Sequence, residues 1–173
     1  LQLKLISFKV TFTEILSMDD VVMKDASSTP PDLYSQFFNN KTLSDFTFKC
    51  SDLIELHVHR FFIAAHSKVF MRMFTTEMEE KNSNAVIFKD ISSDTMKAAL
   101  KFIYTKESNF TDTESTIKVL DVAEKYEFPE LKQRCIDQLM ANVDEENVLE
   151  IFEAADLYNV HLLEEKCLSI IAE

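Results

Sequence analysis

No glycine occurs among the 173 residues of this chain. Phosphate-binding loops, dinucleotide-binding turns and nucleophile elbows need a backbone that adopts positive φ or approaches a ligand closely, and glycine supplies both properties. The sequence therefore argues against the enzyme classes that depend on those loops. The chain contains 15 Phe and 7 Met, which indicates a large apolar core together with some contact surface.

The charge balance restricts the partners of the chain. Its 18 Lys and Arg stand against 30 Asp and Glu, a net charge of -12 that would repel a phosphate backbone. Cys50, Cys135 and Cys167 lie far apart in apolar patterns, as reduced, buried thiols do. The longest apolar run, 61–65, falls far short of the ~20 residues that span a bilayer. We expect no nucleic-acid or membrane partner, no cofactor, and a cytoplasmic and/or nuclear location.

Apolar periodicity predicts an α+β fold with a small, mainly three-stranded sheet. The stripe Leu33, Tyr34, Phe37, Phe38 predicts a short amphipathic helix after a proline-containing linker. A period of two indicates a bulged strand in 1–16, and it predicts strands at 45–50, 55–59 and 85–88. Helical periodicity predicts helices at 61–65, 67–74 and 92–104.

Beyond residue 111 the pattern is helical and repeats at an offset of 32 residues. Tyr126 and Cys135 recur as Tyr158 and Cys167, and the apolar positions between them recur as well. Two consecutive helical hairpins built on one plan would stack and share a core. The two cysteines then occupy equivalent buried helix positions.

Three of the four histidines, His57, His59 and His66, lie within ten residues of one another. On a continuous strand His57 and His59 would share a face and could bind Zn²⁺ with His66, but no Cys or carboxylate completes the set at a standard spacing. We therefore favour a surface position for His57, a strand end for His59 and a helix boundary for His66. No spacing marks a Ser-His-Asp triad.

The segments LSDFTFKC, VHRFFIAAHSKVFMRMF, AVIFKDISSDTMKAALKFIYT and LDVAEKYEFPELKQRC follow one another with short gaps. In this order they resemble the BTB/POZ domain over about residues 33–142. The EMEE segment and the paired helices after residue 142 are similar to those of the MATH-BTB adaptors, the group that includes speckle-type POZ protein. The resemblance implies three parts: 1–32, similar to the end of a MATH domain plus a linker; 33–142, the BTB domain; and 143–173, a hairpin similar to the 3-box at the start of BACK.

The same resemblance implies a homodimer. It assigns the apolar dimer contact to Leu33, Tyr34, Phe37 and Phe62, and it makes Asp45 and Arg60 a candidate ion pair at the seam between subunits. The alternative is that these apolar side chains belong to the core of one subunit. A partly desolvated ion pair specifies geometry more than it adds stability.

Met78, Glu79 and Glu80 match the hydrophobic-x-Glu motif of BTB domains that bind cullin-3. Without that context, the segment would be an exposed acidic loop. Tyr104 and Tyr126 are further candidate cullin contacts, and the 143–173 hairpin would enlarge the surface. The implied function is a non-catalytic adaptor of an E3 ubiquitin ligase, with the protein substrate held by an upstream domain. The alternative is a BTB oligomerisation module of a transcriptional or cytoskeletal scaffold.

Two turns depart from the family pattern. Glycine is usual before the second strand and after the Tyr-Thr pair, whereas this chain has SDLIEL and YTKE at these places. We therefore expect both turns to differ in conformation, with Lys106 standing where glycine is common.

Overall fold

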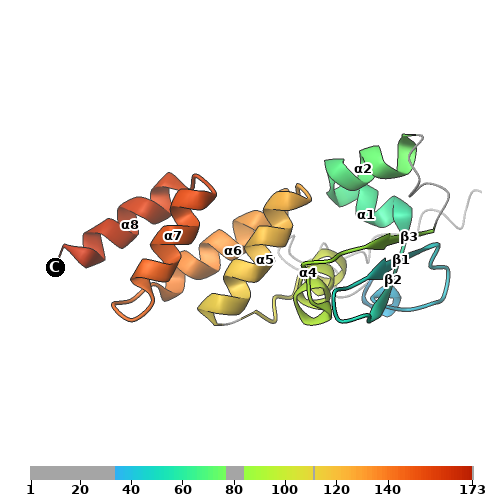
Figure 1. Cartoon of the computed structure of the whole chain (residues 1–173), viewed down its shortest axis with the longest axis horizontal. Helices are drawn as coiled ribbons and strands as arrows, with labels where there is room; N and C mark the ends of the chain where they lie inside the picture. The colour runs from blue at the N-terminus through green and yellow to red at the C-terminus, as the bar shows by residue number, and fades with distance from the viewer. Residues whose placement is uncertain (1–33, 77–83, 111, 173) are drawn as a thin grey trace, which may run out of the picture. The chain divides into compact units, whose positions relative to one another are not determined.

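The computed structural model describes residues 34–76, 84–110 and 112–172, all within one compact unit, Asp32–Glu173. The strand expected in 1–16 and the linker lie outside the described residues, as do Leu33 and the Met78-Glu79-Glu80 motif. The helices and strands, labelled in Figure 1, are η1 (Ser35–Phe37), β1 (Phe46–Lys49), β2 (Glu55–Val58), α1 (Arg60–His66), α2 (Lys68–Thr75), β3 (Ala85–Ile87), α4 (Ser93–Thr105), α5 (Thr113–Lys125), α6 (Pro129–Asn142), α7 (Val148–Leu157) and α8 (His161–Ile171). This small three-stranded sheet with seven α-helices confirms the α+β expectation.

The sheet has the strand order β2-β1-β3, so the central strand is the first in sequence. β1 pairs antiparallel with β2, with Phe46 opposite Val58, and parallel with β3, with Thr47 opposite Ala85. Alternation along β1 buries Phe46 and Phe48 on one face. After β2 the chain runs through α1 and α2, which lie together beside the sheet in Figure 1, and then pairs as β3 with the edge of β1 opposite β2.

The core beneath the sheet is largely aromatic. Phe48 stacks on Phe70 of α2 with ring centroids 5.1 Å apart and meets Phe88 edge to face at 5.0 Å. Phe70 in turn stacks on Tyr126, which follows α5. These offset and edge contacts each add about 0.5–1.5 kcal/mol beyond the apolar area that they bury. The sheet, the α1–α2 pair and the later helices therefore share one core.

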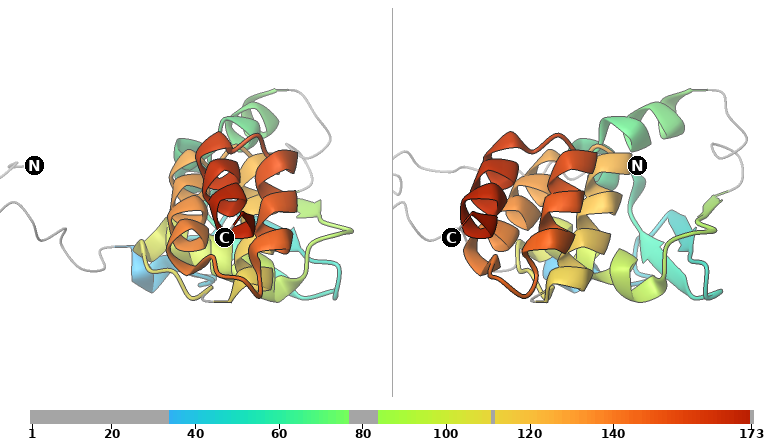
Figure 2. Two further views of the ribbon diagram at one scale, coloured as in Figure 1. Left: turned by 90° about the vertical axis from the view of Figure 1, so that its left-hand side faces the viewer. Right: turned by 60° about the vertical axis from the view of Figure 1, so that its left-hand side comes forward.

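The four last helices form the two hairpins that the repeat predicted. Figure 2 shows α5 with α6 and α7 with α8 as packed pairs that stack on each other. The hairpin turns are equivalent: the N–H of Phe128 bonds the Ala123 carbonyl and the N–H of Val160 bonds the Ala155 carbonyl, each at 2.8 Å. Each of these hydrogen bonds spans five residues, as in a Schellman motif. Glu127, directly before Phe128, has the left-handed φ that the motif requires.

The expectation that the two glycine-free turns would change conformation is wrong. Leu53 (φ 65°), before β2, and Lys106 (φ 62°), which caps α4, both adopt the left-handed backbone that glycine would favour. For a residue with a Cβ, this conformation costs about 1–2 kcal/mol. At Lys106 this backbone closes α4, because its N–H bonds the Phe102 carbonyl at 2.7 Å, and the Lys106 ammonium pairs with Glu130 of α6.

None of the helices in the described part of the chain has the length and apolar character to cross a bilayer.

Candidate functional site

An apolar surface lies where η1 meets the start of α1. It surrounds a hollow of about 160 Å³. Three of its side chains face solvent: Tyr34 is 45% exposed, Phe61 is 74% exposed and Leu43 is 78% exposed. The residues that line the hollow, called the aromatic surface below, are Tyr34, Phe37, Leu43, His59, Phe61, Phe62 and Tyr104.

The two phenylalanines at the start of α1 face in different directions, Phe61 toward solvent and Phe62 toward the core. Phe62 is buried and stacks on Tyr104 at 4.5 Å, while its other side meets Tyr34 at 4.9 Å. Phe61, one residue earlier, points outward because consecutive helical residues are about 100° apart. Of the expected dimer residues, Tyr34, Phe37 and Phe62 therefore meet in one place.

Phe37 lies deeper than the other η1 side chains. It packs edge to face on His59 with centroids 5.5 Å apart, and the following residue, Phe38, packs against Tyr104 at 6.3 Å. Where the apolar stripe predicted a short amphipathic helix, the structure has a 3-10 helix of three residues, η1. One side of this segment therefore belongs to the protomer's own core, and Tyr34 remains on its outer side.

His59 supports this surface from below through a closed set of hydrogen bonds. Its Nε2 lies 3.1 Å from the Thr42 carbonyl, which can only accept, so Nε2 carries the proton. Its Nδ1 then accepts from the Tyr104 hydroxyl at 2.9 Å, and that hydroxyl accepts the His59 backbone N–H at 3.1 Å. Burial raises the pKa of Tyr104 to about 12, which keeps the hydroxyl a donor.

The histidines do not form the shared strand face that a metal site would need. β2 ends at Val58, so His59 lies beyond the strand and is buried with both ring nitrogens engaged. His57 remains on the strand, where its backbone N–H bonds Asn39. Burial lowers the pKa of His66, at the end of α1, which favours its neutral form. In the described segments no three His, Cys, Asp or Glu side chains are grouped to hold a metal ion.

Asp45 and Arg60 meet, but not as the side-chain ion pair that was expected. The Asp45 carboxylate accepts the backbone N–H of Arg60 at 2.8 Å and thereby caps the start of α1. The Arg60 guanidinium instead lies over the Phe46 ring and donates to Asn84. The family resemblance implied that the two residues meet, and the contact within the protomer joins the Asp45 carboxylate to the Arg60 backbone.

Tyr104 is unsuited to the cullin contact assigned to it, because it is only 4% exposed and lies beneath Phe62. Tyr126 is half-buried, and its carbonyl accepts a hydrogen bond from Ser67 at 2.5 Å, which ties the α1–α2 junction to the α5–α6 turn. Its ring rests on Phe70 and against Phe88, beside β3.

The sequence reasoning did not assign Phe61 or Leu43 to the aromatic surface. Phe61 stands in an unbroken apolar run, 61–65, where periodicity does not show which side chain is excluded from the core. Leu43 is a lone apolar residue in a polar turn, and its left-handed φ of 61° is the local sign that the backbone there is constrained.

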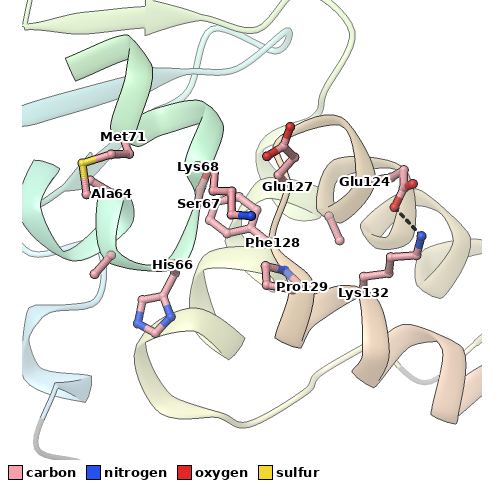
Figure 3. Close-up of a pocket in the computed structure, with 12 residues that line it drawn as sticks. Ala64, His66, Ser67, Lys68, Met71, Glu124, Glu127, Phe128, Pro129 and Lys132 are labelled. Atoms are coloured by element: carbon pink, nitrogen blue, oxygen red, sulfur yellow. Dashed lines mark ion pairs between the residues drawn. The ribbon is translucent and has the colours of Figure 1, made fainter. Parts of the chain in front are cut away.

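A second, more open hollow of about 560 Å³ lies between α1–α2 and α5–α6. Figure 3 shows Met71 and Lys68 on one side and Glu124, Glu127 and Lys132 on the other, with the Glu124–Lys132 ion pair at 2.8 Å. Its floor is formed by small or apolar side chains, including Phe128. A mixed charged rim over an apolar floor is typical of interaction surfaces.

Comparison with known proteins agrees with this architecture. The family model described as BTB/POZ domain matches residues 34–142. The chain is 32% identical over 130 residues to the BTB/POZ domain-containing protein At1g55760 of Arabidopsis thaliana, a match that covers 75% of this chain and 39% of that relative. The chain thus spans well under half of the relative's length.

The chain belongs to the BTB/POZ family. Its BTB domain is a non-catalytic module for protein–protein interaction, and BTB domains typically oligomerise. The aromatic surface, which presents side chains for packing rather than reactive groups, fits this class.

Proposed function

We propose that this chain is a homodimeric adaptor that binds cullin-3 and brings a substrate to a cullin-RING ubiquitin ligase. The observation that carries the proposal is the aromatic surface, where Phe61 and Leu43 are mostly solvent-exposed around an apolar hollow. Large exposed apolar side chains grouped around a hollow favour a protein partner. A second copy of the chain brings the same side chains, so a two-fold arrangement is self-complementary.

The cullin part of the proposal is supported by the sequence Met78-Glu79-Glu80 between α2 and β3. A methionine flanked by charges offers an apolar anchor, and a glutamate offers a charged contact. Tyr126 lies beside β3 and contributes from the α5–α6 turn. The activity is then proximity: the adaptor raises the effective concentration of the substrate at the ligase, and a dimer adds bivalency.

The resemblance to MATH-BTB adaptors supplies the substrate side of the proposal. We propose that the protein substrate binds a domain upstream of residue 33 and that the α7–α8 hairpin acts as the 3-box. The cytoplasm and/or nucleus remains the proposed location, because cullin-RING ligases act there.

Calorimetry tests cullin binding directly. The wild-type chain should bind the amino-terminal region of cullin-3 at micromolar affinity or tighter, and Met78→Glu should abolish the binding while leaving the dimer mass unchanged. Leu53→Glu is the control, because Leu53 is an exposed apolar residue in the turn before β2, outside the motif and both hollows. Full binding by Met78→Glu, or no binding by the wild type, would favour the scaffold function without a ligase.

A further inference from the structure

The α7–α8 hairpin presents apolar side chains that stay uncovered within the described part of the chain. Leu149 is 67% exposed, Leu168 is 51% exposed and Ile171 is 49% exposed. Leu149 lies at the start of α7 and the other two lie in the last turns of α8, so all three are at the end of the hairpin opposite its connecting turn. Phe152, one helical turn after Leu149, is half-buried. The four side chains, called the end face below, are Leu149, Phe152, Leu168 and Ile171.

The 32-residue repeat gives each of these positions a counterpart in the α5–α6 hairpin. The counterparts are Ile117, Leu120, Ile136 and Leu139. Leu139 is 1% exposed, whereas its counterpart Ile171 is 49% exposed, and Leu120 is fully buried. Ile117 and Ile136 are partly buried against the core, and Ile117 lines a small hollow with Ala154 of α7. The same helix positions are therefore covered in the first hairpin and open in the second.

Stacked helical repeats end on a polar surface where nothing further packs on them. The end face is apolar instead, although α7 and α8 lie in front of the other helices in the left view of Figure 2. Grouped exposed apolar side chains mark an interaction site. Since α7–α8 is what stacks on α5–α6, the structure that suits the end face is another helix with an apolar stripe.

The polar contacts between the two hairpins show which groups such a helix should carry. The Tyr158 hydroxyl, just after α7, donates to the Asp121 carboxylate of α5 at 3.1 Å, and the Lys166 ammonium of α8 donates to the Met140 carbonyl of α6. The covering hairpin thus supplies donors, and the covered hairpin supplies acceptors. Glu153 is exposed and stands 32 residues after Asp121. A helix that stacks in the same way meets a carboxylate at this point.

The charge of the hairpin also favours a cationic helix. The single lysine of α7 and α8, Lys166, already donates to α6. The acidic side chains of the two helices are Glu150, Glu153, Asp156, Glu164 and Glu165. A basic partner is attracted to this surface, whereas a second copy of the chain would bring the same acidic groups and be repelled.

We infer that the end face docks a basic amphipathic helix of another protein. The apolar stripe of that helix covers the end face, and its Lys or Arg side chains pair with Glu153 and its acidic neighbours. This surface is separate from the one proposed for cullin-3, because α8 and β3 lie at opposite ends of the structure in Figure 1. The inference therefore holds with or without cullin binding.

The test uses the whole chain and a synthetic peptide of about 18 residues that forms a helix with a leucine stripe and lysines elsewhere. Calorimetry should show saturable binding at one site per chain. Two control peptides should not bind measurably: one with glutamate in place of lysine, and one with the same composition but no stripe. Binding should weaken as the ionic strength rises from about 0.05 M to about 0.5 M, because salt screens the charge contribution.

Variants of the chain locate the site. Leu168→Asp removes an apolar contact and should weaken binding of the lysine peptide about tenfold. Glu153→Lys reverses a charge at an exposed position, so the fold should persist, and it should also weaken binding. Leu162→Asp is the matched control, because Leu162 is an exposed leucine on α8 whose counterpart is the polar Glu130. It should bind like the wild type, and circular dichroism should be unchanged in all three variants.

The inference is overturned if the wild type does not bind the lysine peptide or if the glutamate peptide binds equally well. It is also overturned if either Leu168→Asp or Glu153→Lys binds like the wild type. Light scattering provides the last check. A fall in the mass of the free chain in Leu168→Asp, but not in Leu162→Asp, would show that a second copy occupies the end face in place of a basic partner.

Discussion

The hydroxyl of Tyr104 lies 2.9 Å from Nδ1 of His59, across 45 residues of sequence, and also accepts the His59 backbone N–H at 3.1 Å. One phenol thereby satisfies two polar groups beneath the aromatic surface. The third polar group, Nε2–H, is satisfied by Thr42. This network explains why a histidine can stand at the base of an apolar surface without binding a ligand.

Tyr104→Phe should destabilise the fold without affecting partner binding. The substitution leaves Nδ1 and the N–H of buried His59 without their partner, at a cost of about 1–3 kcal/mol in the free energy of unfolding. Urea unfolding measures the change. Tyr158→Phe is the control, because the Tyr158 hydroxyl bonds exposed Asp121 at 3.1 Å. Its removal should cost about 1 kcal/mol or less. A stable Tyr104→Phe variant with lost cullin binding would show that Tyr104 does contact the partner.

Phe61→Asp should convert the proposed dimer into a monomer, because it places a charge in the centre of the aromatic surface. The side chain is mostly exposed in the protomer, so the fold should persist. Multi-angle light scattering should show the mass halve, with circular dichroism unchanged. Leu162→Asp provides the control, since Leu162 is a similarly exposed apolar residue on α8. Equal masses for both variants would exclude Phe61 from the dimer contact.

Leu53→Gly should stabilise the protein. Leu53 is 89% exposed and has a φ of 65°, so glycine removes the Cβ penalty and sacrifices little packing. After the entropy cost of glycine, a gain of about 0.5–1 kcal/mol is expected as a higher denaturant midpoint with an unchanged m-value. Leu53→Ala keeps the Cβ and should give no gain; a gain of the same size from alanine would contradict the backbone explanation.

Protonation of Asp112 should lower the stability of the protein in acid. Hydrogen bonds from Ser115 to this N-cap carboxylate of α5, together with the Ser115 backbone N–H at 2.8 Å, lower its pKa. A lowered pKa in the folded state contributes stability above the unfolded pKa of about 4, and this is lost as the pH falls through the folded value. Asp112→Asn keeps an N-cap side chain but has no carboxyl group to protonate. Below about pH 4, the free energy of unfolding of this variant, measured in urea, should therefore fall less steeply than that of the wild type. If the variant and the wild type lose stability identically with pH, Asp112 is not a source of the acid sensitivity.

The two helical hairpins were predictable because their signal is local and repeated. Cys135 and Cys167 recur at the same helix position, and burial of both follows from the periodicity around them. The strands were predictable for a similar reason, since alternation along β1 specifies which side chains face the core.

The conformation of the glycine-free turns was not predictable from residue type. Lys106 takes the left-handed conformation at the end of a helix whose last turn is buried, and its ammonium pairs with Glu130 of α6, so tertiary contacts outweigh a local penalty of this size. The family pattern indicated where a turn lies, but residue preference alone pointed to the wrong conformation.

The sequence by itself determined the α+β class, the repeated hairpins and the family, because periodicity and motif order are properties of consecutive residues. Tertiary structure decided that Phe61 is exposed whereas Phe62 is buried, that Tyr104 supports His59, and that the Arg60 guanidinium turns to Asn84 rather than Asp45. The physical reason is that each of these outcomes depends on a partner at least 24 residues away in the sequence. Local patterns say nothing about which distant groups meet.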